Sequence, residues 1–313
     1  MNNNDWFYSK MFAVAIYTKT GQAFEDFFCE ILKASNDDFN KVKASGKVGD
    51  RSCDGFNSKT GDYYLCYSPE DIKKELTIKN GINKIKNDIK GITKKWNGIS
   101  KINYVINDKF SGVSPKIYDL IKELKEIYSN LDIELFSMER LRKICLSLDE
   151  IDKQRILGYC PDLTNNKTAV NFSIVSDIIE YLEKNVLLQT YEDNLFVPDF
   201  SQKISFNKLS QKVADLLNNA KYHTFQIDEF YNLNPERDKE DLRNYLRCLY
   251  LEAISAVGAL DSDYSDKIFF YIMQKMVYNT KSKSVVDNAI IIITFFFESC
   301  DIFEEPVGEG INE

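Results

Sequence analysis

The chain has 313 residues, 44% of them hydrophobic and 28% charged, and this composition excludes a disordered or low-complexity protein. The formal net charge of -8 excludes a protein that coats nucleic acid through overall positive charge, because neutralising phosphates requires clustered Lys and Arg. Any contact with DNA must therefore be local, and the length predicts more than one domain.

The chain begins with the pattern of a helix followed by short strands. Residues 21–34 place Phe, Ile and Leu side chains at helical spacing, with charged residues on the other faces. The stretch 38–71 is punctuated by Gly and carries β-type residues, which predicts a strand meander with a turn from Asn57 to Gly61 and an exit at Pro69. We therefore expect an amphipathic helix ahead of a strand meander.

The next stretch alternates between helices and strands. Helical spacing returns over 70–98, and the sequence KINYVIND at 101–108 is typical of a short buried strand. Ser114 and Pro115 suit the N-cap and first turn of another helix, and residues 132–141 predict a strand that enters a helix. The order helix, strands, helix, strand, helix, strand predicts an α/β domain.

We expect three parts: an α/β domain over 1–150, a helical connector over 151–203 and an all-α domain over 204–313. The connector is irregular, with Pro and Asn as helix breakers. In the third part the apolar run 289–297 (AIIIITFFF) is about half the length needed to span a bilayer, so we interpret it as a buried helix. The predicted helical segments of this part are 209–217, 241–256, 264–277 and 285–297.

Cysteine and histidine usage restricts the chemistry further. The seven Cys residues are scattered without the close pairs of a structural zinc site, which predicts reduced, mostly buried thiols. The only His, His223, excludes a His-rich metal site. The start MNNNDWFYSKMF lacks the features of a secretory signal, so we expect a cytoplasmic protein without membrane association.

Acidic residues near the start of the chain suggest phosphodiester chemistry. Metal-assisted cleavage needs carboxylates that hold Mg²⁺ near the scissile phosphate, and commonly a Lys. Asp50 and Asp54 lie four residues apart in the Gly-bracketed segment GKVGDRSCDGF, after the helix that contains Glu25. This order predicts that the carboxylates converge on a pocket able to hold a divalent cation.

The segments GQAFEDFFCEIL, GDRSCDGF and YYLCYSP resemble the Mrr-like branch of the PD-(D/E)XK nuclease superfamily over about the first 145 residues. The resemblance implies a restriction-endonuclease-like fold, with a central mixed sheet flanked by helices, and Mg²⁺ or Mn²⁺ as cofactor. It implies that Glu25 is the helix Glu, that Asp54 is the metal-binding Asp and that Asp50 assists it. It also implies that the protein acts on DNA.

The third element of this pattern is different here, because Leu65, Cys66 and Tyr67 stand where the family has Q-x-K or E-x-K. Two alternatives remain open: a Lys from elsewhere completes the site, or Tyr67 orients a nucleophile or contacts DNA. The candidates for that Lys are Lys43, Lys47, Lys73 and Lys74, and the candidate DNA contacts are Lys47, Arg51, Lys73 and Lys74. The Lys-rich stretch 73–101 suits either a solvated helix face or a DNA contact.

The C-terminal segments IFFYIMQKMV and FFFESCDIFEEP resemble the C-terminal domain of the effector component in ABC-three-component (Lamassu-like) antiphage systems. This resemblance covers about the last 110 residues. It implies docking, through residues such as Phe297, Asp301 and Phe303, on an SMC-like ABC ATPase and a small middle component, with self-association as a further option.

Two functions stay open at this point. One is a DNA endonuclease effector that its partner subunits hold in check. The other is a catalytically inactive adaptor with a nuclease fold, which binds DNA or bridges protein subunits.

Overall fold

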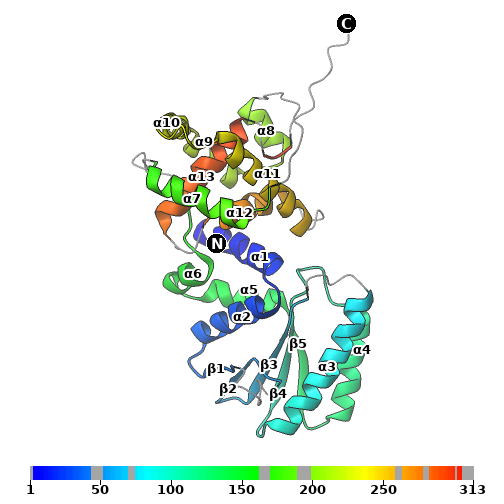
Figure 1. The fold of residues 1–313 in the computed structure, drawn as a ribbon. Coiled ribbons are helices and arrows are strands. Elements are labelled where there is room, and N and C mark those ends of the chain that lie inside the picture. Colours follow the sequence, from blue (N-terminus) through cyan, green and yellow to red (C-terminus); the bar gives the residue numbers. More distant parts are fainter. Residues whose placement is uncertain are drawn as a thin grey trace. The chain divides into compact units, whose positions relative to one another are not determined.

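The computed structural model describes residues 3–43, 52–69, 75–161, 170–188, 199–257, 263–277, 282–299 and 302–304. The chain forms two compact units (Figure 1). Ala15–Ile156 form one, here called the α/β unit. Met1–Val14 and Leu157–Glu313 together form the other, here called the helical unit. The three-part division inferred from the sequence, with boundaries after residues 150 and 203, stays a prediction.

The α/β unit is built on a five-stranded mixed sheet in the order β1-β2-β3-β4-β5. Strand β2 pairs antiparallel with β1 and with β3, whereas β4 pairs parallel with β3 and with β5. The predicted meander and the predicted turn after Asn57 are confirmed. The strands are β1 (Phe39–Lys41), β2 (Gly55–Asn57), β3 (Asp62–Tyr67), β4 (Lys101–Ile106) and β5 (Asp132–Phe136).

Helices cover both faces of this sheet (Figure 1). The helices α3 (Glu75–Lys95) and α4 (Pro115–Ile127) lie side by side on one face, where their Ile and Leu side chains form a buried cluster with β3 and β4. On the other face α2 (Gly21–Ser35) packs against β1 and β3, and α5 (Met138–Ser147) packs against α2. The helix α6 (Glu150–Leu157) follows α5.

The alternation of side chains along β3 decides which residues meet α2. Tyr63 and Leu65 belong to the buried cluster under α3 and α4, and Tyr67 packs against it. Tyr64 points the other way, because its ring lies 5.6 Å from that of Phe28 on α2. Since side chains of a strand alternate between faces, Cys66 also faces α2.

The helical unit is arranged around α13, in which every residue from Val285 to Phe297 is buried. This confirms the buried helix predicted from the apolar run, and α13 packs against α7, α9 and α12. Nowhere in the described part of the chain is a helix both long and apolar enough to cross a bilayer. The helices are α7 (Phe172–Asn185), α8 (Phe200–Phe206), α9 (Gln211–Lys221), α10 (Phe225–Leu233), α11 (Lys239–Ala256), α12 (Tyr264–Met276) and α13 (Lys283–Glu298).

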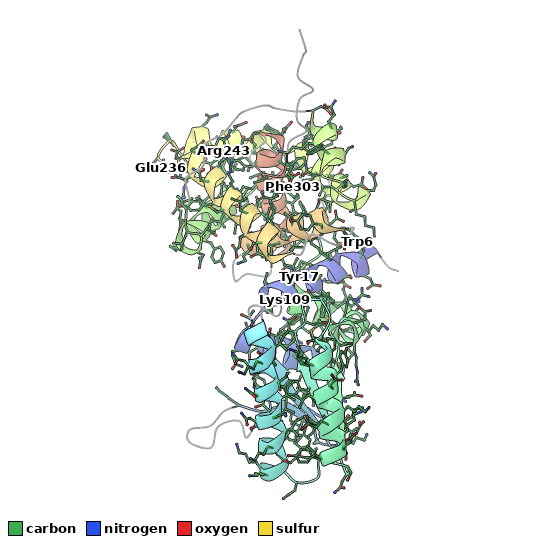
Figure 2. The ribbon with its side chains drawn as sticks, turned by 90° about the vertical axis from the view of Figure 1, so that its right-hand side faces the viewer. Trp6, Tyr17, Lys109, Glu236, Arg243 and Phe303 are labelled. Carbon is green, nitrogen blue, oxygen red and sulfur yellow. The ribbon has the colours of Figure 1, made fainter. Side chains whose placement is uncertain are left out.

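The first helix, α1 (Asn3–Thr18), contributes its residues up to Val14 to the helical unit. The ring of Trp6, labelled in Figure 2, lies 5.8 Å from that of Phe270 in an edge-on contact. The side-chain amide of Gln274 donates a hydrogen bond of 3.2 Å to the carbonyl of Met11. The helical unit is therefore assembled from both ends of the sequence.

Candidate functional site

The helix α2 presents polar residues at the edge of its buried face. Its apolar side chains, including Phe24 and Phe28, are buried. Glu25 is half-buried and Asp26 is exposed. The Gln22 amide donates hydrogen bonds of 2.9 Å to both carboxylates, so it fixes their positions on the helix.

Asp54 is held in the sheet directly before β2. Its carbonyl accepts from the amide of Val42 at 2.9 Å, and its own amide donates to the carbonyl of Tyr64 at 3.0 Å. Its carboxylate Oδ2 accepts from the amide of Cys66 at 2.5 Å. Asp54 is thus tied to strands on both sides, and its side chain lies beside Cys66.

Two buried thiols, those of Cys29 and Cys66, lie near these carboxylates. Burial, above all, raises the pKa of Cys66, and the charges of Asp54 and Glu25 raise it further. Burial also raises the pKa of Cys29, where Lys41 lowers it and Asp54 and Glu25 raise it. The Cys29 thiol also donates a hydrogen bond of 3.6 Å to the carbonyl of Asp54, so the residue before β2 lies beside α2, the helix that carries Glu25.

Lys41 belongs to the same group of residues, although sequence reasoning did not single it out. Its ammonium forms an ion pair with Asp26, and this hydrogen bond, followed by the one from Gln22, lowers the pKa of Asp26. Lys41 also interacts electrostatically with Glu25 and Cys29. The sequence signal for Lys41 is its position two residues after Phe39. Residues two apart in a strand share a face, and Phe39 is buried.

Tyr67 does not join this group. Its hydroxyl donates to the carbonyl of Thr77 at 3.5 Å, on the side of α3. By the same alternation the α2-facing positions of β3 are Asp62, Tyr64 and Cys66, so Leu65 and Tyr67 of the predicted Leu65-Cys66-Tyr67 element lie on the opposite face. The physical reason is the two-residue period of a strand, by which a shift of one position moves every side chain to the other face.

The carboxylates of Glu25 and Asp54 are the kind of ligand that magnesium takes. Within the described residues, the side chains of His, Cys, Asp and Glu nowhere form a group of three that could hold a metal ion. Magnesium is commonly bound by one or two carboxylates plus waters and substrate phosphates, and Glu25 and Asp54 suit that arrangement. The predicted ligand Asp50 lies outside the described residues, as do the predicted DNA contacts Lys47, Arg51, Lys73 and Lys74.

A separate cavity of about 330 Å³ lies on the α3 and α4 side, at the carboxyl ends of β3 and β4. Burial raises the pKa of the Tyr67 phenol in its wall, which therefore stays neutral near pH 7. The lining suits a small uncharged group rather than acid–base chemistry. The cavity is lined by Tyr67, Pro69, Thr77, Ile78, Ile106, Ser111, Gly112, Val113, Ser114 and Ile117.

The predicted docking residues of the helical unit are only partly described. Phe297 is fully buried and Phe303 is 6% exposed, with their rings 5.5 Å apart. Figure 2 shows Phe303 among the side chains of this unit. Asp301 lies outside the described residues. The two rings therefore belong to the interior, because an aromatic stripe on a last helix also serves to close a core.

Comparisons with known proteins gave a single kind of match. No curated protein and no solved structure matches the chain. Residues 173–304 match the family model described as C-terminal domain 10 of the ABC-three component (ABC-3C) systems. The match covers α7 to α13, starting about 30 residues before the segment in which sequence features indicated this resemblance. The helical half of the chain is thus similar to a C-terminal domain of ABC-three component systems.

Proposed function

We propose that this protein is the effector component of an ABC-three-component antiphage defence complex. In this proposal the α/β unit cleaves DNA with the help of a divalent cation, and the helical unit binds the partner subunits. The family match over residues 173–304 supports a place in such a system. The observation that supports the nuclease activity is the contact between Asp54 and α2, the helix of Glu25, because the Cys29 thiol of that helix donates a hydrogen bond of 3.6 Å to the Asp54 carbonyl.

The architecture of the α/β unit supports the same proposal. A restriction-endonuclease-like domain is expected to have a central mixed sheet flanked by helices. Here β1 to β5 form such a sheet, with α2 on one face and α3 and α4 on the other. Glu25 comes from the helix that precedes the sheet, and Asp54 comes from the residue before β2, in the order that the resemblance implies.

In this proposal Asp54 and Glu25 supply the carboxylates for a metal ion, and Gln22 orients one of them. A magnesium ion, when bound, polarises the phosphate and lowers the pKa of a coordinated water. Asp54 offers its carboxylate from a fixed position, since the Cys66 amide holds Oδ2. Gln22 orients the Glu25 carboxylate through its amide. Rigid placement of both oxygens is what metal-assisted cleavage requires of the protein.

The proposed partners are DNA, an SMC-like ABC ATPase and a small middle component. Docking keeps the α/β unit silent until the complex is triggered, and self-association accompanies its activation. Exposed apolar side chains suitable for partner contacts lie along α9 and α10: Tyr222, Phe225 and Leu233 are 79%, 64% and 64% exposed. Such side chains are enriched where proteins bind one another.

A second candidate function is a catalytically inactive adaptor with the same fold. The observation that favours it is the chemistry of β3, where the α2-facing side chains nearest Asp54, those of Tyr64 and Cys66, are neither an acid nor a Lys. In this case the α/β unit binds DNA or a protein subunit without cleaving it.

A cleavage assay separates the two functions. The full chain, alone and assembled with its partner subunits, is incubated with plasmid DNA and Mg²⁺ or Mn²⁺. We expect metal-dependent cleavage that Asp54→Asn abolishes and that Asp37→Asn, which changes an exposed carboxylate of the same unit, leaves intact. Intact plasmid with the assembled and triggered complex would rule out the nuclease and leave the adaptor.

A further inference from the structure

The strand β3 lacks a positive charge at the position where the proposed reaction needs one. Of its α2-facing residues, Cys66 stands beside the Asp54 carboxylate, where its amide donates to Oδ2. A thiol carries no positive charge in either protonation state, so Cys66 cannot stabilise a negative charge on a phosphate.

We infer that Lys41 of β1 supplies this positive charge and contacts the scissile phosphate beside Glu25 and Asp54. The inference rests on the proposed nuclease function and deepens it. Lys41 is the last residue of β1 and pairs with Gly55, the residue after Asp54. The next residue, Val42, donates its amide to the carbonyl of Asp54 at 2.9 Å. These bonds bring the backbones of Lys41 and Asp54 close together.

The direction of the side chain agrees with this placement. Lys41 shares its face of β1 with Phe39, whose ring lies 5.6 Å from that of Tyr64 on the α2 side. Its ammonium reaches the Asp26 carboxylate of α2, and its charge acts on Glu25 and Cys29. The Lys41 side chain is 38% exposed, so the ammonium can also meet a phosphate that approaches from solvent.

Lys41 is suited to donate hydrogen bonds and not to act as a base. Burial favours its neutral form, but the hydrogen bond and charge of Asp26 outweigh burial and raise the pKa of Lys41. The ammonium therefore keeps its protons at neutral pH. Asp26, which touches Lys41 and not the phosphate, is a positioning residue.

The step that Lys41 assists is hydrolysis of one phosphodiester bond. The oxygen of a water molecule forms a bond to phosphorus, and one ester P–O bond breaks. The attacking water loses a proton to solvent, and the leaving oxygen gains one. Negative charge builds up on the non-bridging oxygens meanwhile, and the Lys41 ammonium donates a hydrogen bond to one of them. Stabilisation of this kind is worth more in the transition state than in the ground state.

The test compares single-turnover cleavage rates at saturating DNA in the full chain, assembled as for the wild type. We expect Lys41→Gln to lower the rate on the order of 100-fold, as removal of one such donor does in other enzymes. Lys41→Arg keeps the charge and should recover most of the rate. Asp26→Asn removes the ion pair that positions the Lys41 ammonium and should lower the cleavage rate roughly tenfold. The matched control is Lys33→Gln, which removes an exposed Lys from the same unit and should cleave at the wild-type rate.

A second readout does not depend on cleavage. Removing a positive charge beside Glu25 and Asp54 should tighten Mn²⁺ binding, measured by calorimetry, roughly threefold or more in Lys41→Gln. Unchanged Mn²⁺ affinity would place the ammonium away from the carboxylates and overturn the inference.

The outcomes for the two proposals differ. If wild type cleaves, Asp54→Asn does not, and Lys41→Gln cleaves as fast as wild type, then the role of Lys41 is overturned and the nuclease function stands. If the triggered wild-type complex leaves DNA intact, the nuclease function fails and Lys41 has no phosphate to act on. Equal thermal midpoints for wild type and Lys41→Gln confirm that the variant is folded.

Discussion

Asp263 in the helical unit is held by two Lys residues that are almost fully buried. The ammonium groups of Lys10, on α1, and Lys267, on α12, both form ion pairs with its carboxylate, and their side chains are only 10% and 9% exposed. Burial alone would raise the pKa of Asp263, but the two hydrogen bonds outweigh burial and lower it. Asp263 therefore links the start of the chain to α12.

This lowered pKa predicts the pH range in which Asp263 stabilises the protein. A carboxyl whose pKa is lower in the folded than in the unfolded state stabilises the fold above its unfolded pKa of about 3.9, and that stabilisation is lost as the pH falls through the folded pKa. Asp263→Asn should lower the free energy of unfolding by about 2 kcal/mol at pH 7, less than for a fully buried pair because Asp263 is partly exposed. The difference from wild type should shrink below about pH 4, in urea unfolding at each pH.

The control for this prediction is Asp228→Asn. Asp228 pairs with Lys239, but both side chains are largely exposed, at 59% and 45%. Its loss should change the free energy of unfolding by about 0.5 kcal/mol or less. An Asp263→Asn variant as stable as Asp228→Asn at pH 7 would contradict the assigned role of Asp263.

The candidate site shows what sequence reasoning reaches at the residue scale. Glu25 and Asp54 could be selected because helix, Gly-rich turn and strand follow in the order of a known pattern. The face of β3 on which Tyr67 lies could not be predicted, because a shift of one residue in the strand register moves every side chain to the other face. Lys41 was not predicted as a site residue, because its ion pair with Asp26 joins β1 to α2 and no local sequence pattern indicates it. The Lys residues that were predicted lie farther along the chain.

At the scale of elements, strand β2 depends on Gly55 for its close contact with β1. A Cβ at Gly55 would lie 2.3 Å from Cζ and 2.9 Å from Cε2 of Phe39, a side chain that is 3% exposed. The Phe39 ring lies against Tyr64 of β3, so it has little room to move. The absence of a side chain at Gly55 allows three strands to pack under α2.

Gly55→Ala should therefore lower the free energy of unfolding by about 2 kcal/mol, as overpacking in a core does. The double variant with Phe39→Leu should recover part of this loss, because a smaller side chain leaves space for the new methyl group. Urea unfolding of the two single variants and the double variant measures the coupling. Strictly additive losses would show that the two side chains do not compete for the same volume.

Elements with a strong local signal were predicted, and those without one were missed. The helix α2 and the helix that starts after Ser114 were predicted from apolar spacing and from Pro115 at the first turn. The buried strand β4 and the entry from β5 into α5 were predicted as well. Helix α1 was missed because apolar residues occur around most of it, so no amphipathic pattern marks it. The short helices α8 and α10 were also not predicted, since seven and nine residues carry little periodicity.

At the scale of the whole molecule, the two compact units predict two unfolding transitions. Domains with their own cores commonly unfold separately, and a two-state description then fails. In calorimetry we expect Gly55→Ala to lower the midpoint of one transition and Asp263→Asn to lower the midpoint of the other. A single transition, shifted by both variants, would show that the units unfold as one.

The helical unit combines residues up to Val14 with residues from Leu157 onward, so it is completed late in synthesis. Ribosomes add about 5–20 residues per second, and domains generally fold as they emerge. The α/β unit is continuous in sequence, from Ala15 to Ile156, so it can fold on the ribosome first. The segment up to Val14 is synthesised before the α/β unit, whereas α13 of the same helical unit is complete only at Glu298. For roughly 15 to 60 s of synthesis these apolar residues lack their final neighbours, which makes them a natural target for chaperones during translation.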